Sequence, residues 1–293
     1  MTDPIHQIDA KVVAQMKVAE ESFILSLEAP SIARTLQPGQ FIQIRCTRKD
    51  DPLLPRPFSI YRVRGKKILD ILYEVVGRGT ELLSEAKKGG RFSIFGPLGN
   101  TFSFPKGRAV SFLVGGGAGL APFFDLSEAL VDPRRGKQKK EDVTVLLGAR
   151  RRGKIFCEKD FKKLGIRFEI ATDDGSYGFK GFVTELLTKH LNRKPYTVNP
   201  VRDLSLNGVN RTRIYACGPK PMLRSVAAIS EKFKIPCEVS IDAYMPCGYG
   251  ICFGCAVRVK QQATSDKQQE NGALYKLACT DGPVFRSEEL SWE

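Results

Sequence analysis

Histidine is scarce in this sequence of 293 residues, where only His6 and His190 occur. Neither lies near a cysteine in the sequence. A Cys or Ser nucleophile needs a histidine or a similar base within hydrogen-bond reach. The sequence therefore disfavours a hydrolase of that kind, and we expect no catalytic side chain of the nucleophile–base type.

Long apolar runs are also lacking. The longest, Ala109–Phe124, is short for a membrane span, and four glycines between residues 115 and 119 interrupt it. Residues 1–10 are polar and lack the apolar core of a secretion signal. We therefore expect a cytoplasmic protein with no membrane span.

Acidic residues are outnumbered by basic ones, and the formal net charge is +14. Such a charge can indicate a nucleic-acid-binding protein. Basic residues cluster at 134–140 and 150–152, but no aromatic residues interleave with the first cluster as a base-stacking platform would require. We therefore expect no nucleic acid partner. A basic face suits an acidic protein partner or an anionic nucleotide.

The first hundred residues are patterned as short strands that Gly and Pro separate. Regular strands and turns of this kind are typical of a small antiparallel barrel. The expected strands are Ser22–Leu27, Phe41–Cys46, Phe58–Val63, Ile68–Val76 and Arg91–Phe95.

Strand and helix patterns alternate after Pro105. This alternation predicts a parallel, doubly wound sheet. The expected strands are Arg108–Val114, Val143–Leu147, Arg167–Ala171 and Arg213–Ala216. The expected helices are Ala121–Leu130, Glu158–Leu164, Thr184–His190 and Pro221–Lys232.

Beyond Cys237 the helical pattern disappears, and only a short helix beginning at Ser287–Leu290 is expected. The chain is long enough for two or three domains. The predicted fold class is multi-domain: an antiparallel β-barrel over residues 1–105, an α/β doubly wound domain over 106–236 and a small cysteine-rich domain over 237–293.

Four of the eight cysteines crowd the C-terminal region. Cys247, Cys252, Cys255 and Cys279 have the C-x4-C-x2-C…C spacing of plant-type [2Fe–2S] sites. Glycines between them allow the positive φ angles that a loop around a cluster needs. Zinc sites more often combine two C-x2-C pairs, and only one is present here. The spacing therefore favours a [2Fe–2S] cluster over zinc.

Two segments in the barrel region have the chemistry of a flavin nucleotide site. Arg56-Pro-Phe-Ser59 offers a guanidinium for a diphosphate and a hydroxyl for a flavin edge. Gly77-Arg-Gly-Thr80 lies where a second phosphate-binding loop would follow, and Gly96-Pro-Leu-Gly-Asn100 closes the barrel. Alone, Arg56–Ser59 could equally be the start of an ordinary strand.

Two further segments follow strands of the α/β region. Gly115–Pro122 joins a strand to a helix and could present backbone N–H groups to an anion. It is not the G-x-G-x-x-G fingerprint, so a purely structural turn is equally compatible with it. Ala216-Cys-Gly-Pro219 ends the fourth strand, where ligands bind in open α/β sheets. Cys217 could be a reactive thiol or a small wall of that crevice.

In this order the motifs resemble the ferredoxin–NADP+ reductase superfamily, and the C-terminal cysteines with the tail Cys279–Phe285 resemble the electron-transfer subunits of dihydroorotate dehydrogenases. The resemblance covers essentially the whole chain. It implies FAD in the barrel, NAD in the α/β domain and a [2Fe–2S] cluster in the last domain. Hydride chemistry of this kind resides in the cofactors and requires no protein base.

Carried onto this sequence, the resemblance implies three groups of site residues. FAD would be held by Arg56, Pro57, Phe58, Ser59, Tyr73, Glu74, Val75, Gly79 and Thr80. The nicotinamide nucleotide would be bordered by Gly116, Gly117, Cys217, Gly218 and Pro219. The cluster would be bound by Cys247, Cys252, Cys255 and Cys279.

The resemblance also implies a partner, an FMN-containing dihydroorotate dehydrogenase catalytic subunit, in a heterotetramer. Electrons would pass from dihydroorotate to the partner's flavin, and then through the cluster and FAD to NAD+, as a step of pyrimidine biosynthesis. One alternative is a reductase subunit of another complex, such as a sulfide- or ferredoxin-linked NAD(P)H oxidoreductase. Another is a zinc-stabilised nucleic-acid-binding module.

The sequence leaves the choice between NAD and NADP open. Arg150–Arg152 follow the second strand of the α/β region and could meet a 2′-phosphate, although a solvated loop is as compatible with them. Asn192–Arg211 and Gln261–Gly272 resemble insertions relative to the family. The second of these lengthens the segment between Cys255 and Cys279 and so bears on the surface that faces the partner.

Overall fold

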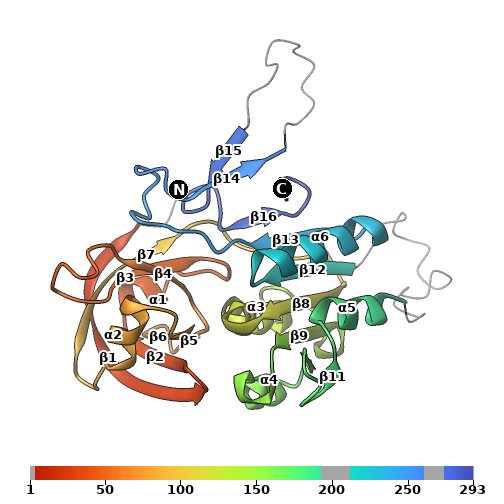
Figure 1. Cartoon of the computed structure of the whole chain (residues 1–293), viewed down its shortest axis with the longest axis horizontal. Helices are drawn as coiled ribbons and strands as arrows, with labels where there is room; N and C mark the ends of the chain where they lie inside the picture. Colours follow the sequence, from red (N-terminus) through yellow and green to blue (C-terminus); the bar gives the residue numbers. More distant parts are fainter. Residues whose placement is uncertain (1–3, 193–211, 261–273, 293) are drawn as a thin grey trace, which may run out of the picture.

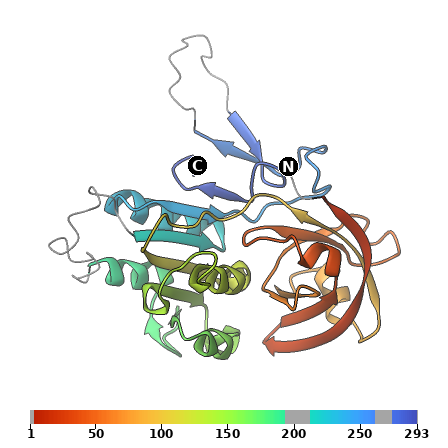
Figure 2. The same cartoon turned by 180° about the vertical axis from the view of Figure 1, so that it is seen from behind.

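The computed structural model describes residues 4–192, 212–260 and 274–292. Both segments that resemble insertions lie outside these ranges, except for Asn192. Within the described ranges no helix is long and apolar enough to cross a membrane. Two sheets stand side by side, and the C-terminal segment crosses over the edge where they meet (Figures 1 and 2).

The N-terminal sheet is antiparallel throughout, with the strand order β4-β3-β7-β1-β2-β6-β5. It curls so that β4 lies beside β6, which gives the predicted barrel (Figure 1). Its strands are β1 (His6–Ala19), β2 (Ser22–Glu28), β3 (Phe41–Arg45), β4 (Arg56–Ser59), β5 (Arg62–Arg64), β6 (Ile68–Glu74) and β7 (Arg91–Leu98). The short helices α1 (Pro30–Ala33) and α2 (Arg78–Ser84) pack against it.

Strand periodicity explains the barrel core. Ile42 and Ile44 of β3 and Leu69 and Ile71 of β6 are completely buried, and each pair is separated by one residue of the opposite face. The same residues form one cluster with Ile94 of β7. The inward-facing residues of alternate positions along these strands therefore fill the barrel.

The second sheet has the order β11-β10-β9-β8-β12-β13-β16 and is parallel except for β16. Its strands are β8 (Val110–Gly116), β9 (Val143–Ala149), β10 (Arg167–Thr172), β11 (Phe179–Lys180), β12 (Thr212–Cys217), β13 (Cys237–Ser240) and β16 (Val284–Arg286). The helices are α3 (Ala121–Val131), α4 (Glu158–Leu164), α5 (Val183–Asn192) and α6 (Lys220–Phe233), with the 3-10 turns η1 (Gly117–Leu120), η2 (Lys140–Asp142) and η3 (Arg152–Lys154).

Helices cover both faces of this parallel sheet, as the sequence predicted. Phe112 and Val114 of β8 pack in one cluster with residues of α5 and α6. Leu113, between them, packs in the other cluster with residues of α3 and α4. Because successive residues of a strand point to opposite faces, one apolar strand supplies both cores.

The C-terminal region adds β16 to the edge of the α/β sheet and forms a separate hairpin of β14 (Ala256–Val259) and β15 (Leu274–Leu277). The predicted helix at Ser287–Leu290 is wrong. The Ser287 amide bonds to the carbonyl of Cys237, and Leu290 forms a bridge with Val259. These contacts with remote segments satisfy backbone groups that a helix would have paired locally.

Two details of the barrel also differ from the prediction. The strand expected at Phe58–Val63 is broken at Ile60 and Tyr61, and β1 was not identified from the sequence at all. Many residues of β1 are exposed or half-buried, so its apolar signal is weak. It is nevertheless central in the sheet, because it pairs with both β2 and β7.

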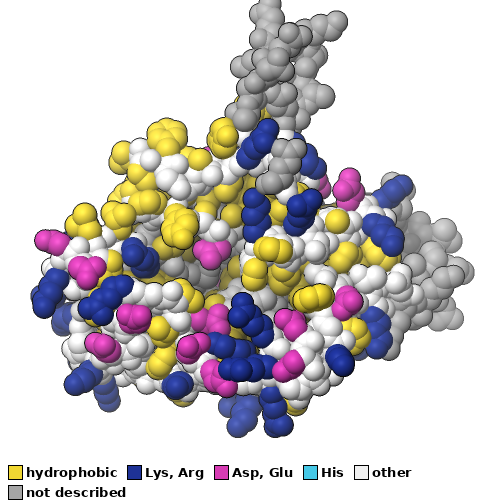
Figure 3. Space-filling model, in the orientation of Figure 1, with side chains coloured by type: hydrophobic (Ala, Val, Ile, Leu, Met, Phe, Trp, Pro, Cys, Tyr) yellow, Lys and Arg dark blue, Asp and Glu magenta, His cyan; other side chains and the backbone are white. Residues whose placement is uncertain are grey.

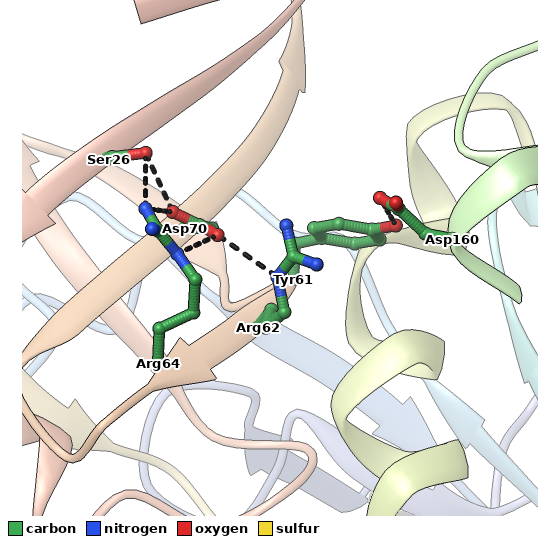
Figure 4. A network of polar contacts seen from close by, with 6 residues as sticks. All are labelled: Ser26, Tyr61, Arg62, Arg64, Asp70 and Asp160. Carbon is green, nitrogen blue, oxygen red and sulfur yellow. Dashed lines mark hydrogen bonds and ion pairs between the residues drawn. The ribbon is translucent and has the colours of Figure 1, made fainter. Parts of the chain in front are cut away.

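The break between β4 and β5 directs Tyr61 toward the α/β region. Tyr61 is buried, and its hydroxyl donates to the Asp160 carboxylate of α4 at 2.9 Å (Figure 4). Its carbonyl accepts from the Asp125 amide of α3. Beside it, Arg62 and Arg64 both pair with Asp70, whose side chain is only 1% exposed (Figure 4). Tyr61 therefore fixes the barrel against the α/β sheet.

Candidate functional site: a nucleotide cavity and a four-cysteine loop

A cavity of about 1140 Å3 lies where the barrel, the α/β sheet and the C-terminal segment meet. Small-molecule sites usually measure about 300–1000 Å3, so its size suits large nucleotide ligands. Of the predicted site residues, those lining it are Arg56, Pro57, Phe58, Ser59, Tyr73, Glu74, Gly79, Thr80, Gly116, Cys217, Gly218 and Pro219. Val75 and Gly117 do not line it.

Arg56 and Gly79 are direct neighbours in this cavity, although 23 positions separate them in the sequence. Arg56 belongs to β4, and its Nη1 donates to the carbonyls of Leu54 and Pro55. A Cβ added at Gly79 would lie only 3.3 Å from the Arg56 Cγ and from the Cys46 Sγ. The absence of a side chain at Gly79 therefore lets the Arg56 stem approach α2.

Gly77–Thr80 was predicted as a phosphate-binding loop, and the structure shows the start of α2 there. The Thr80 hydroxyl accepts from the amides of Val76 at 2.9 Å and Gly77 at 3.2 Å, and it donates to the Gly77 carbonyl. This capping holds the first turn next to Arg56. The free amides of a helix start favour an anion, so the turn retains the chemistry for a diphosphate.

Three residues at and just beyond the end of β6 were predicted beside the flavin, and two of them, Tyr73 and Glu74, line the cavity. Tyr73 is buried, and its hydroxyl accepts a 2.7 Å bond from Gln15. Burial raises the pKa of Tyr73 to about 12, so it stays a neutral phenol at physiological pH. Glu74 also lines the cavity, whereas the Val75 amide bonds to the Glu21 carbonyl of the barrel.

The glycine turn after β8 brings the α/β sheet to the barrel. Gly117 has a φ of +54°, which favours glycine, and a Cβ there would lie 3.4 Å from the Glu74 Oε2. A Cβ at Gly119 would collide with the Cys217 carbonyl. The turn thus needs small residues both for its own conformation and for its contact with β12.

Cys217 is a wall of the cavity rather than a reactive thiol. Burial raises the pKa of Cys217 to about 12, although the Ser240 hydroxyl lowers it slightly and the Asp242 carboxylate raises it further. The thiolate is the nucleophilic form, so a thiol with this pKa is inert near neutral pH. Neither histidine lines this cavity in the described part of the chain.

The four predicted cluster ligands come together as two pairs. The Sγ atoms of Cys255 and Cys279 lie 3.2 Å apart, and both side chains are buried. The Cys247 sulfur interacts with the side chain and the backbone amide of Cys252. In the described ranges no three His, Cys, Asp or Glu side chains surround a point that a single ion could occupy. Two pairs of thiols fit two irons.

Backbone amides prepare Cys247 for deprotonation. Burial raises the pKa of Cys247, but the amides of Cys252, Tyr249 and Ile251 outweigh this effect and lower the pKa to about 6. The Cys252 Sγ accepts from the Gly254 amide at 3.4 Å. Cys247 and Cys252 would thus hold one iron as thiolates that amides stabilise, and Cys255 and Cys279 would hold the other.

The cysteine loop rests on the barrel beside the cavity. The buried Gln43 of β3 donates to the Met245 carbonyl at 2.6 Å. A Cβ at Gly248, where φ is +76°, would press on side chains of Gln43 and Leu98. Met245 also lines the cavity. Met245 is only two residues before Cys247. The chain therefore passes directly from the wall of the nucleotide cavity to the first cysteine pair.

Sequence reasoning missed several residues of this site. Asp242 and Tyr244 line the cavity just beyond β13, and Gln43 anchors the loop. Asp242 lies just beyond the carboxyl end of the parallel strand β13, as Gly218 lies just beyond β12. Ligands bind at such strand ends, so predicting β13 from the sequence would have identified Asp242 as a site residue. No local signal distinguishes Gln43, because its role depends on a segment 202 residues away.

A barrel with a nucleotide cavity, a parallel sheet that completes the cavity and a two-iron cysteine loop define an iron–sulfur flavoprotein reductase of pyridine nucleotides. Solved structures agree. A structure of an NADH-dependent reduced ferredoxin–NADP oxidoreductase matches with a TM-score of 0.77 and 28% identity, over 97% of this chain and 90% of that chain. A ferredoxin reductase of carbazole 1,9a-dioxygenase shares the fold, with a TM-score of 0.62, 22% identity and coverage of 80% and 67%.

The chain belongs to the family of dihydroorotate dehydrogenase B (NAD(+)) electron transfer subunits. It is 38% identical to the subunit from Desulforamulus reducens over 97% of this chain and 98% of that one, and 36% identical to the subunit from Geobacillus thermodenitrificans over 95% and 96%. The family model for the iron–sulfur cluster binding domain of dihydroorotate dehydrogenase B matches residues 242–291. The oxidoreductase NAD-binding domain model matches residues 113–228.

These matches confirm the predicted fold class and the predicted cofactors FAD, [2Fe–2S] and NAD. They also confirm an oxidoreductase that transfers electrons. When bound, the cluster supplies one-electron chemistry and the flavin links it to hydride exchange with the nicotinamide. The protein supplies the cavity, the amides and the thiols that bind and orient these groups.

Proposed function

We propose that this chain takes electrons at its cysteine loop from a dihydroorotate dehydrogenase catalytic subunit and delivers them to NAD+ at the cavity. The site residues act as the resemblance implies: Arg56–Ser59, Tyr73–Val75, Gly79 and Thr80 toward FAD, Gly116, Gly117 and Cys217–Pro219 toward the nicotinamide nucleotide, and the four cysteines toward the cluster. The names of the relatives, which are subunits of an NAD(+)-dependent dihydroorotate dehydrogenase, support this assignment.

The observation that carries the proposal is the apolar surface around the cysteine loop. Cys252 is exposed, and the side chains next to it, Ile251 and Phe253, are 77% and 68% exposed. Tyr244, at the start of the same segment, is 91% exposed. Figure 3 shows hydrophobic side chains gathered over the side of the molecule where this segment runs. Such patches on soluble proteins mark contact sites for other proteins.

The partner is best described as an FMN-containing catalytic subunit that forms a heterotetramer with two copies of this chain. The cavity of this chain serves FAD and the pyridine nucleotide. Dihydroorotate oxidation therefore requires a second flavin, which another subunit supplies. The domain limits that we propose are 1–105 for FAD binding, 106–236 for NAD binding and 237–293 for the cluster. The native mass of the purified complex and its FMN content test the assembly.

The variant Cys247→Ser tests the electron route. FAD-replete variant protein should still oxidise NADH with ferricyanide, because the cavity residues are unchanged. It should lose dihydroorotate-dependent reduction of NAD+ when mixed with the catalytic subunit. Survival of that reaction without the cluster would contradict the route. Cys157→Ser, a change outside the loop, serves as the matched control and should retain both activities.

A further inference from the structure

A second cavity, of about 730 Å3, lies at the amino-terminal ends of β12 and β13, where α6 and β16 meet them; we call it the edge cavity. The redox cavity lies at the opposite, carboxyl ends of the same two strands. None of the residues predicted to hold FAD, the nicotinamide nucleotide or the cluster lines the edge cavity. Its volume is within the usual range of small-molecule sites, about 300–1000 Å3, so it has room for a ligand of its own.

Basic side chains from separate parts of the chain converge on the edge cavity. Arg224 comes from α6, Arg286 from β16, and Lys260 directly follows β14, where its amide bonds to the Glu289 carbonyl. Figure 3 shows Lys and Arg side chains gathered over the region where Figure 1 places β14, β16 and α6. The lining contains five basic and three acidic side chains: Arg213, Arg224, Lys234, Lys260 and Arg286 against Glu231, Glu238 and Glu288.

The lining carboxylates leave the positive charge largely uncompensated. Glu238 of β13 is the register partner of Arg286 in β16, but its Oε2 accepts from the Ser103 amide at 2.9 Å. In the described part of the chain no hydrogen bond or ion pair engages the side-chain nitrogens of Arg224, Arg286 or Lys260. Cations gathered in this way repel one another, and an anion among them relieves the repulsion. Guanidinium groups suit a phosphate especially well, because they bind its oxygens in pairs.

The only tryptophan of the chain, Trp292, borders the same cavity. Its indole N–H donates to the Ser287 carbonyl at 3.0 Å, and this bond fixes the orientation of the ring. The ring is half-buried against the α/β core, and Ile235 and Pro236 add apolar surface to the lining. Nucleobases stack on aromatic rings beside arginines, whereas a bare inorganic anion makes no use of such a ring. The lining therefore suits a ligand that combines a planar base with a phosphate.

Buried, uncharged groups form the floor of the edge cavity. Ser230 and Ser287 are each only 4% exposed, and their Oγ atoms lie 3.3 Å apart. The Ser230 hydroxyl also donates to the Ala227 carbonyl at 2.8 Å. Burial raises the pKa of the Cys237 thiol beside them to about 12, although both hydroxyls lower it. The charged side chains thus surround a recessed polar floor, which distinguishes the edge cavity from a flat basic surface.

We infer that the edge cavity binds a nucleoside monophosphate, with the base against Trp292 and the phosphate among Arg224, Lys260 and Arg286. The carboxylates of Glu231 and Glu288 border the cavity and can accept hydrogen bonds from the ribose hydroxyls. This binding activity goes beyond the electron-transfer function and does not depend on it, because the residues of the two sites differ. The exception is Trp292, which also lines the redox cavity.

The test uses the fluorescence of Trp292 in FAD-replete protein that carries its cluster. Because the chain has no other tryptophan, its emission reports on ligands at this ring. We expect saturable quenching by UMP or AMP at submillimolar concentration, and equilibrium dialysis should give one bound nucleotide per chain. Uridine and inorganic phosphate should each bind at least about tenfold more weakly, since each lacks one half of the contacts.

Lys260→Gln and Arg286→Gln should each raise the dissociation constant of the nucleotide about tenfold or more, because each removes a charged donor to phosphate. Lys232→Gln is the matched control, since Lys232 is an exposed residue of α6 that does not line the cavity. It should bind the nucleotide as wild type does. All three side chains are exposed, and circular dichroism and FAD content check that each variant is folded.

Four results would overturn the inference. One is the absence of UMP and AMP binding by both methods. Another is inorganic phosphate binding as tightly as the nucleotides, which would reduce the cavity to a simple anion site. A third is an equal loss of affinity in Lys232→Gln and Lys260→Gln, or no loss in either. The last is competition with NADH in the ferricyanide assay at an inhibition constant equal to the dissociation constant, which would assign the binding to the redox cavity.

Discussion

The ring of Tyr249 in the cysteine loop stacks on the ring of Phe95 in β7, with centroids 4.7 Å apart and an angle of 6° between the planes. Tyr249 lies between the first two cluster cysteines, and Phe95 belongs to the flavin barrel. The stack and the Gln43–Met245 bond both join the loop to the barrel. The redox loop is therefore anchored on the domain that receives its electrons.

Tyr249→Ala should make the cluster easier to lose. A stacked aromatic pair contributes about 0.5–1.5 kcal/mol beyond its buried area, which corresponds to a several-fold change in local opening. We expect the 2Fe–2S absorbance to bleach several-fold faster in chelator and mild denaturant, while FAD stays bound. Tyr249→Phe keeps the stack and should bleach at the wild-type rate. Equal rates in all three proteins would show that the stack does not hold the loop.

Cys252→Ser should remove the cluster and leave the flavin. The change deletes one thiolate of the Cys247–Cys252 pair, whereas Arg56 and Gly79 lie in a different part of the molecule. Iron and acid-labile sulfide analysis with a visible spectrum should show iron close to zero and nearly one FAD per chain. A full iron complement in this variant would rule out Cys252 as a ligand. Joint loss of FAD and iron, together with a changed circular dichroism spectrum, would indicate unfolding.

Arg56→Ala should weaken FAD binding without affecting iron content. A lost charge-assisted hydrogen bond costs about 1.5–3 kcal/mol, or roughly a tenfold to hundredfold rise in the dissociation constant. Fluorescence titration of the deflavinated protein with FAD measures this. Arg48→Ala is the control, because Arg48 is 79% exposed and pairs only with Asp9 among the contacts identified in residues 4–192. Equal affinity in the two variants would remove Arg56 from the flavin site.

Asp125 should make the folded state less stable as the pH rises from about 4 to 7. Burial in α3 raises the pKa of Asp125 to about 7, despite the attraction of Arg135, whereas the unfolded chain has the ordinary value near 3.8. Between these values the unfolded state releases the proton and the folded state retains it, so the free energy of unfolding falls with rising pH. The full shift is worth on the order of 1–4 kcal/mol.

Asp125→Asn should remove this part of the pH dependence, so its stability relative to wild type should increase steadily from pH 4 to pH 7 and then level off. Urea unfolding at several pH values measures the difference. Asp132→Asn provides the control, because the side chain of Arg134 lowers the pKa of the exposed Asp132 below its ordinary value near 3.8. Asp132 is therefore ionised in both the folded and the unfolded state above pH 4, and the difference in stability between this variant and wild type should stay nearly constant from pH 4 to pH 7. Parallel curves for Asp125→Asn and wild type would refute the raised pKa.

The sequence by itself determined the features that have a local code. The C-x4-C-x2-C spacing, the glycine turn after β8 and the alternation of strands with helices each depend on neighbouring residues, and all agree with the structure. Backbone conformation and helix periodicity act over a few residues, so they leave a trace that can be read directly. The helix α4 was predicted to the residue for this reason.

The tertiary structure alone decided what depends on distant segments. Strand β1 is held by pairing with β2 and β7, and Ser287 is drawn away from a helix by Cys237. Only folding divides the four cysteines into two pairs and brings Arg56 next to Gly79. Hydrogen-bond partners remote in sequence leave no periodic signal, because the chain chooses among them only when the sheets form and the cores close around them.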